Sequence, residues 1–464
     1  MTHSPERVRG AFAPPDRPTR LLLGVIGLSV ALRMAAAFYL GNSVAPLPGI
    51  FDQVSYHTLA VRVLDGHGFS FGTAWWPATP ANQPTAHWSF LYVLFLTAVY
   101  DVGGPSPLVA RLVQALAVGV LQPLLTYRVA TRLFGARVGL VSAAVVACYA
   151  YFVYYAAALL TESFYIVAIL WSLDRAMALA SAGERSAQQR GRLWLQLGLA
   201  LAVAVLLRQV VLAVVPLILL WSWWKADVRG PAFGVAVAGR RQSTAGAIAA
   251  VLIVVAAILP WTIRNYGAFH QFVPLNTNAG FAFYWGNHPI HGTRFVPILP
   301  DGMYTRLIPD ELQGLDEAEL ERVLMRRGLA FVSDDPARFL LLSASRIREY
   351  MKFWPSRDSG RASNYARVLS FGVCLPFMVS GVVIALSRNR RDVGRASPDQ
   401  RAAIWLLLGV AGIYSLVHLL TWTLVRYRLP VDAVLLPFAA LSMVCVWDQF
   451  LASARARVEN RATI

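Results

Sequence analysis

Charged residues and cysteines are both scarce in this chain of 464 residues. Only 14% of the residues are charged and 57% are hydrophobic, whereas about a quarter of an ordinary soluble domain is charged. This balance excludes a typical soluble protein and predicts an all-α polytopic membrane protein. The three cysteines, Cys148, Cys374 and Cys445, each lie inside an apolar run. Their placement excludes a disulfide framework and a cysteine metal site.

Acidic residues are also few: the chain has 25 of them and 42 lysines and arginines, which gives a formal net charge of +17. Such a charge could suggest a nucleic-acid partner. The basic residues, however, are dispersed in short clusters between apolar runs of about 20 residues, which is typical of loops that orient a membrane protein. We therefore expect membrane lipids and no nucleic acid as partners. Internal repeats, direct or inverted, are absent from the sequence, which weakens a transporter interpretation.

The apolar runs predict about ten transmembrane helices, with the cationic loops on the cytoplasmic side. The first run, Leu21–Leu40, follows Arg17 and Arg20, so the N-terminus should be cytoplasmic. A cleaved signal peptide is the alternative, although Arg33 and the length of the run argue against it. Val210–Trp224 is expected as the sixth span, and the C-terminal tail is again basic. The protein should thus cross the plasma membrane many times, with both termini cytoplasmic.

Three parts are expected along the chain. Residues 1–260 should form an N-terminal transmembrane catalytic module that includes a first outer loop at 41–104. Residues 261–365 have a soluble-like composition and should form a small outer-face subdomain with helices, one of them beginning at Pro336 with Asp335 as its cap. Residues 366–464 should supply the last transmembrane helices and a cytoplasmic tail.

Five groups should converge on the outer face. Asp52 follows a Gly/Pro turn after the first span, and Glu162 lies in an aromatic stretch at the same face. The cationic groups are Arg208, Arg264 with Asn265, and Arg426 with Arg428. Arginine binds phosphate through a planar fork, and a carboxylate can accept a proton from a hydroxyl or an amine. This set suits transfer of a sugar from a lipid phosphate, because phosphate is already a good leaving group.

Several stretches resemble the GT-C class of integral-membrane glycosyltransferases, in the bacterial branch similar to protein O-mannosyltransferases and the lipid A aminoarabinose transferase, a family 39-like group. The similar pieces occur in the family's order: FDQVSYHTLAVRVLDGHGF, PTAHWSFLYVLFLTAVY, LLTESFY, PWTIRNYGAFHQFVPLNTNAGFAFYWGNHP and RYRLPVDAVLLPFA. The resemblance implies a transmembrane bundle with interfacial helices in the first outer loop and a cavity open to lipid. It also implies a polyprenyl-phosphate sugar donor, a lipid, glycan or protein acceptor, and hexosyl or pentosyl transfer with inversion.

The resemblance also implies roles for individual residues. Asp52 matches the first-loop aspartate that acts as catalytic base, but Gln53 replaces the glutamate that follows it in the mannosyltransferases, which argues against protein O-mannosylation. Glu162 matches an acidic position that shapes the site and in some relatives binds a divalent metal, so no cofactor is certain and a metal is possible. Arg264 and Arg428 are the expected phosphate contacts. His87, with Tyr56 nearby, is the local candidate for a basic residue in the first loop.

Each candidate also has a structural interpretation. Asp52 could simply cap a helix beginning near Ser55, and Glu162 could pair with Arg208 as a structural ion pair. Arg426 and Arg428 could be anchors at a helix end. The further arginines inside spans, Arg33 and Arg111, should pair with carbonyls or acids.

Two other functions stay open from the sequence. A flippase or other transporter of lipid-linked sugars would need polar or broken helices at mid-membrane, where alanine, valine and leucine prevail here. A non-catalytic subunit of an envelope assembly complex would tolerate the loss of Asp52, which an enzyme would not.

Overall fold

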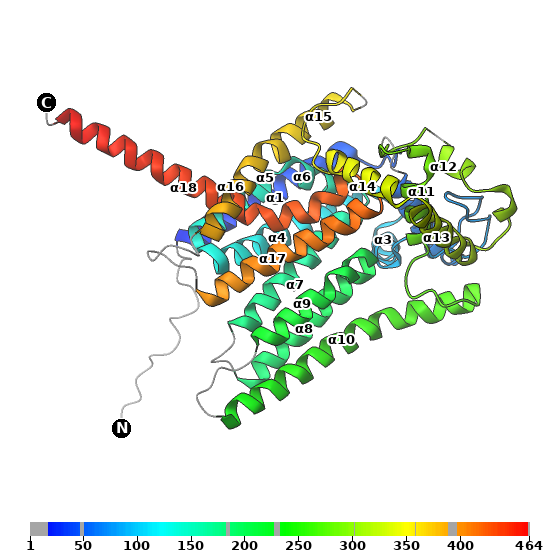
Figure 1. Ribbon diagram of the computed structural model, residues 1–464, viewed down its shortest axis with the longest axis horizontal. Helices are drawn as coiled ribbons and strands as arrows, with labels where there is room; N and C mark the ends of the chain where they lie inside the picture. Colours follow the sequence, from blue (N-terminus) through cyan, green and yellow to red (C-terminus); the bar gives the residue numbers. More distant parts are fainter. Residues whose placement is uncertain are drawn as a thin grey trace.

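The computed structural model describes residues 17–46, 51–181, 186–226, 233–300, 302–357, 359–387 and 397–462. Within these ranges the chain is helical, and β-structure is limited to isolated bridges such as Ser70 with Pro84. Long helices form a bundle, and shorter helices and loops gather at one end of it (Figure 1). The all-α polytopic class predicted from composition is confirmed.

Eight described helices are long and apolar enough to cross a membrane, or nine if one bent pair counts as a single span. The bent pair joins α5 and α6 at an angle of 56°. The elements of the bundle are α1 (Arg17–Leu40), α4 (Pro107–Phe134), α5 (Ala136–Cys148), α6 (Ala150–Ala157), α7 (Glu162–Ala180), α8 (Ala187–Leu207), α10 (Phe233–Phe269), α15 (Arg361–Arg367) continuing through a π-helical turn into α16 (Val373–Ser387), α17 (Pro398–Leu420) and α18 (Leu429–Ala462).

The expected sixth span is shorter than the sequence suggested. Its residues divide between a 3₁₀ turn, Gln209–Ala213, and the 11-residue helix α9, Val215–Lys225. Pro216 occupies the first turn of α9, where its missing N–H is harmless and its fixed φ favours the start of a new helix. The hydrophobic run is therefore interrupted, and α9 alone is too short to span a bilayer.

Buried arginines tie the first helices together. Arg33 of α1 donates to the carbonyls of Val146 and Ala147, which the break between α5 and α6 leaves without helical partners. Arg111 of α4 donates to the carbonyls of Gly41 and Ala157. The predicted pairing of both arginines with carbonyls is confirmed.

The segment expected to form the first outer loop contains two helices, α2 (Asp52–Leu64) and α3 (Phe90–Gly103), which pack against each other. The segment between them is held by hydrogen bonds from the Arg62 guanidinium to Ser70 Oγ (3.2 Å) and Asn82 Oδ1 (2.9 Å). These bonds fix the segment between α2 and α3 against α2.

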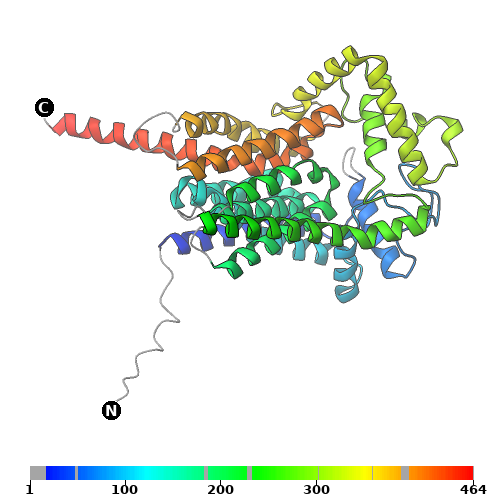
Figure 2. The same ribbon diagram turned by 60° about the horizontal axis from the view of Figure 1, so that its bottom comes forward.

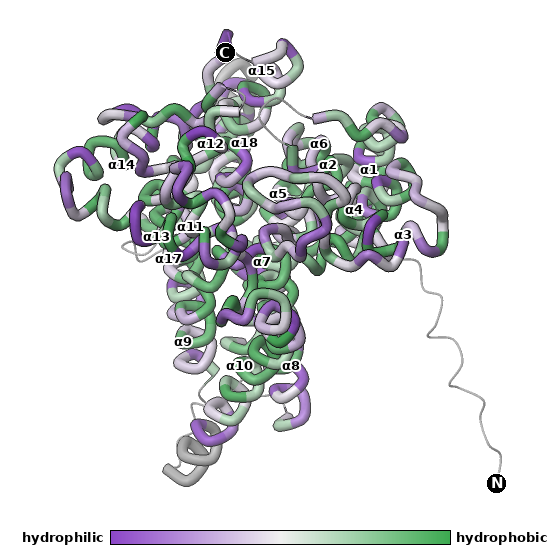
Figure 3. The backbone as a smooth tube through the Cα atoms, turned by 90° about the vertical axis from the view of Figure 1, so that its right-hand side faces the viewer, coloured by the Kyte–Doolittle hydropathy of each residue, from purple (hydrophilic) through white to green (hydrophobic). Residues whose placement is uncertain are grey.

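A small helical subdomain lies at the same end of the bundle and contains α11 (Ala279–Asn287), α12 (Met303–Arg306), α13 (Glu317–Asp334) and α14 (Pro336–Tyr350). Asp335 caps α14 as predicted, accepting from the N–H of Arg338 at 2.9 Å. Helices α11 and α13 approach closely, since a Cβ on Gly280 would stand 2.0 Å from the Glu321 carbonyl oxygen. Hydrophilic residues are concentrated around this subdomain, whereas α8 and α10 are mainly apolar (Figure 3).

Buried Glu317 joins this subdomain to the first outer loop. Its carboxylate accepts hydrogen bonds from the Thr79 and Thr85 hydroxyls, the Ala86 N–H and the Thr277 hydroxyl. The start of α1 and the end of α18 lie at the opposite end of the bundle (Figure 2).

Helix α10 continues through Pro260 to Phe269, so the expected boundary at residue 261 falls inside a helix.

Candidate active site

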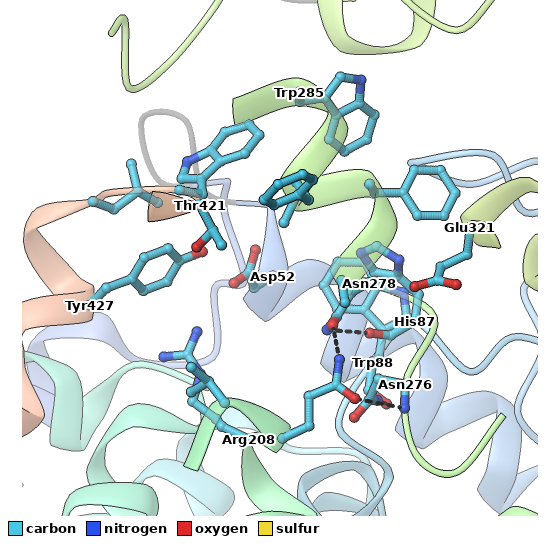
Figure 4. A pocket seen from close by; sticks show the side chains of 18 of the residues that line it. Asp52, His87, Trp88, Arg208, Asn276, Asn278, Trp285, Glu321, Thr421 and Tyr427 are labelled. Carbon is cyan, nitrogen blue, oxygen red and sulfur yellow. Dashed lines mark hydrogen bonds between the residues drawn. The ribbon is translucent and has the colours of Figure 1, made fainter. Parts of the chain in front are cut away.

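A cavity of about 860 Å³ lies where the bundle meets the first outer loop and the subdomain. The parts that contribute to it include the start of α2, the loop between α2 and α3, the turn after α8, the segment between α10 and α11, helices α11 and α13, the residues around α12, the end of α17 and the 3₁₀ turn before α18. The residues considered below that line it are Asp52, Tyr56, Trp76, His87, Trp88, Arg208, Gln209, Asn276, Asn278, Phe281, Trp285, Glu321, Arg426 and Tyr427. Figure 4 shows the positions of many of these side chains.

Asp52 is the first residue of α2, and Phe51 occupies the N-cap position before it. Its carboxylate instead contacts Arg426, with 2.6 Å between Oδ2 and Nη1. The interpretation of Asp52 as the cap of a helix beginning near Ser55 is therefore wrong. The side chain remains 23% exposed, so it can reach a molecule in the cavity.

Glu162 and two arginines complete the charged cluster. Arg208 Nη1 lies 3.1 Å from Glu162 Oε1, and Arg426 Nη1 lies 3.6 Å from the same oxygen. Glu162 is buried, and its Oε2 has no hydrogen-bond partner. Both guanidinium groups stand near the face of Tyr427, at 5.0 and 5.2 Å from the ring centroid. Two carboxylates and two guanidinium groups from four separate parts of the sequence therefore meet at one wall of the cavity.

The carboxylates do not form a recognisable metal site. Arg426 already stands between Asp52 and Glu162, where a bridging cation would have to bind. Among the residues that the structure describes, no three His, Cys, Asp or Glu side chains converge as ligands. The residues present therefore do not fit a divalent metal at this place.

The structure places the other predicted phosphate contacts outside the cavity. Arg264 donates to the carbonyls of Phe69 and Thr85 and to Oδ1 of Asn265. Asn265 is buried and binds the carbonyls of Val273 and Leu275. Arg428 is buried too, where it pairs with Asp432 at 3.0 Å. These three side chains already have protein partners.

His87 and Tyr56 do line the cavity. Burial lowers the pKa of His87 below its ordinary value, which favours the neutral imidazole. Its Nδ1 is buried without a hydrogen-bond partner. Burial raises the pKa of Tyr56, whose ring packs edge-on against Trp88 with 5.6 Å between centroids.

Amide side chains form a further part of the wall that the sequence analysis did not assign. Gln209 Nε2 donates to Asn278 Oδ1 at 2.6 Å, and Asn278 in turn donates to the carbonyl of His87. Asn276 donates through its side chain to the carbonyl of Trp88 at 2.8 Å. In the sequence, Gln209 was marked only by its position beside Arg208, and Asn276 and Asn278 only by their position in the stretch LNTNAG.

Comparison with known proteins gives one family match. Residues 87–263 match the family described as dolichyl-phosphate-mannose-protein mannosyltransferase. This range includes Glu162 and Arg208 but neither Asp52 nor Arg426. No curated protein matches the chain.

Solved structures of similar fold cover far more of the chain. The archaeal oligosaccharyltransferase AglB from Archaeoglobus fulgidus, in complex with an inhibitory peptide and a dolichol-phosphate, superposes with a TM-score of 0.55 at 16% identity over 96% of this chain. This chain spans 52% of that enzyme's length. ArnT from Cupriavidus metallidurans bound to undecaprenyl phosphate is also similar, with a TM-score of 0.40 and 15% identity over 92% of this chain and 78% of its own.

The family match and the structural match both agree with the class of membrane glycosyltransferases that the sequence resembles. The sequence match is local, and the structural match extends over nearly the whole chain. This protein therefore has the fold of the GT-C class of membrane glycosyltransferases and is similar in sequence to the mannosyltransferase family over residues 87–263.

Proposed function

We propose that this protein is a membrane glycosyltransferase that moves a sugar from a polyprenyl-phosphate donor to an acceptor at the extracytoplasmic face. The observation that carries the proposal is the accessible Asp52 carboxylate, paired with Arg426 beside Arg208 at the wall of a large cavity. Such a wall offers a proton acceptor and two cations within one site.

The arginines are suited to the donor phosphate. The phosphodiester of the donor carries one negative charge, which becomes two as the bond to the sugar breaks. Arg208 and Arg426 both line the cavity, so their charges stabilise the departing phosphate monoester. Arg426 Nε is buried and has no hydrogen-bond partner among the residues that the structure describes. No general acid is then needed on the leaving-group side.

Asp52 serves as the base in this proposal. An acceptor hydroxyl or amine attacks the anomeric carbon on the face opposite the phosphate, so the configuration inverts. Asp52 takes the proton that the acceptor loses, while the ion pair with Arg426 fixes the direction of the carboxylate. The reaction requires the base and the leaving group to stand on opposite sides of the sugar ring.

The test is transfer from undecaprenyl-phosphate sugars to envelope lipid, glycan and protein fractions by the purified protein in nanodiscs. Asp52→Asn should lower the transfer rate by about 10²- to 10⁴-fold, as expected for loss of a positioned base. Asp65→Asn is the matched control, because Asp65 is an exposed carboxylate at the other end of α2. Rates within a few-fold of wild type for Asp52→Asn would refute the assignment of the base.

A second measurement identifies the donor independently of the acceptor. Mass spectrometry of lipids that co-purify with the protein should find polyprenyl-phosphate sugars enriched over the bulk membrane. Enrichment should persist in Asp52→Asn, since this variant keeps both arginines. Absence of any polyprenyl-phosphate species from both proteins would contradict the proposed donor class.

A further inference from the structure

One wall of the cavity carries polar atoms that are buried and have no partner. Within the described part of the chain, Nδ1 of His87 and Nε1 of Trp88 find no hydrogen-bond partner, although the two side chains are only 7% and 5% exposed. In Figure 4 these residues lie on one side of Asp52, and Tyr427 and Arg208 lie on the other. Burying an unpaired polar group is costly, so such atoms at a cavity point to a ligand that pairs with them.

Aromatic rings surround these atoms. The His87 ring contacts Trp76, Trp88 and Phe281, with centroid distances of 5.6, 5.2 and 5.5 Å. Trp76 also stacks on Trp285 at 5.5 Å. The wall thus combines broad apolar faces with a few directional polar groups, which is the composition of a small-molecule pocket. A sugar ring has the complementary surface, with C–H groups on its faces and hydroxyls at its edge.

Glu321 of α13 adds an acceptor to the same wall. Its Oε1 accepts from the N–H of Gly280 at 2.9 Å, and no ion pair to it is found within the described ranges of the chain. The wall therefore presents an N–H donor at Trp88, an acceptor at Glu321 and a neutral imidazole at His87. A hydroxyl both donates and accepts, so a ring of hydroxyls satisfies all three groups. An ammonium group could satisfy only the acceptors.

We propose that His87, Trp88 and Glu321 form the subsite for an uncharged sugar, whose hydroxyls they bind while its ring lies against the neighbouring aromatic faces. This inference rests on the proposed function and deepens it, because it assigns the donor's sugar and its phosphate to different walls. The phosphate binds Arg208 and Arg426, and the anomeric carbon lies between the two walls, near Asp52.

The test compares equilibrium binding of undecaprenyl phosphate with that of the same lipid carrying a hexose, an amino sugar or a uronic acid. The protein is the full chain in nanodiscs. The hexose should bind more tightly than the bare lipid phosphate. His87→Phe and Trp88→Phe should each weaken hexose-lipid binding by about 3- to 12-fold, the value of one hydrogen bond, and leave undecaprenyl phosphate unchanged.

Two matched controls come from residues whose nitrogen atoms are already paired. Trp75 Nε1 donates to Ser55 Oγ at 2.9 Å, and His57 Nδ1 lies 2.9 Å from the Tyr100 hydroxyl. Neither residue lines the cavity. Trp75→Phe and His57→Phe should therefore leave the hexose preference intact, and Glu321→Gln provides a third subsite variant that preserves size.

The outcomes separate the two proposals. Equal weakening of bare lipid phosphate and hexose lipid in the subsite variants would overturn the subsite. Tighter binding of the amino sugar or the uronic acid than of the hexose would overturn the assignment to an uncharged sugar. If wild-type protein bound none of the undecaprenyl-phosphate lipids, the proposed function itself would fail and the subsite with it.

Discussion

Replacing Arg208 by alanine should weaken the donor's phosphate contact without removing the base. The guanidinium lines the cavity next to Arg426 and pairs with Glu162 at 3.1 Å. A charge-assisted hydrogen bond contributes about 1.5–3 kcal/mol, which corresponds to a loss of roughly 10- to 150-fold in affinity or rate. If the contact already forms with bound donor, KM should rise. If it strengthens as the phosphate departs, kcat should fall as well.

The same substitution also affects stability. Glu162 is buried, and without Arg208 its nearest remaining cation is Arg426 at 3.6 Å. Loss of one partner of a buried pair typically costs about 3–5 kcal/mol, so the melting temperature of Arg208→Ala should fall. Arg208→Lys should restore most of the stability because it keeps the charge, yet only part of the kinetics because lysine lacks the planar fork.

The control for this prediction is Arg264→Ala. Arg264 lies outside the cavity and donates to backbone carbonyls of the first outer loop. Its loss should lower the melting temperature, because structural hydrogen bonds are removed. Donor KM and kcat of the folded fraction should stay within about threefold of the wild-type values. Kinetics changed by Arg264→Ala and unchanged by Arg208→Ala would refute the assignment of the phosphate to Arg208.

Three further outcomes are expected. Chelators should leave transfer unchanged, because Arg426 stands where a metal would bridge the carboxylates; a complete block by chelator would contradict this. Burial lowers the pKa of His291 from 6.5 to about 4, so the unfolded chain binds more protons between these values and the melting temperature should fall as pH drops through that window, less so in His291→Gln. Cysteine at Thr293, in the subdomain, should react with an impermeant thiol reagent in intact cells and cysteine at Ser397 should not, whereas the opposite pattern would invert the proposed orientation.

The sequence was sufficient for the class of fold and for much of the charged cluster. Hydropathy and the distribution of arginine predicted the bundle, and the expected meeting of Asp52, Glu162, Arg208 and Arg426 agrees with the distances. These four residues follow or precede long apolar runs, so their depth in the membrane could be estimated from position alone.

The direction in which each side chain points could not be predicted from the sequence in the same way. Arg426 and Arg428 belong to one short 3₁₀ turn, yet the first lines the cavity and the second is buried against Asp432. Residues two apart in a helical turn point in different directions. The amide wall was missed for a related reason, since Gln209 and Asn278 meet only through the tertiary fold.

Buried Arg33 has a consequence for how the protein is made. Its carbonyl partner Ala147 follows 114 residues later in the chain. Ribosomes add about 5–20 residues per second, so for roughly 6–23 seconds the Arg33 guanidinium lacks the Ala147 carbonyl and has only Ser29 of α1 and, later, Gln122 as native partners. An arginine at the centre of a span costs about 2.5–3.5 kcal/mol on insertion scales. The first helix should therefore stay beside the insertion machinery until the end of α5 has been synthesised, and the order of synthesis becomes part of how the bundle assembles.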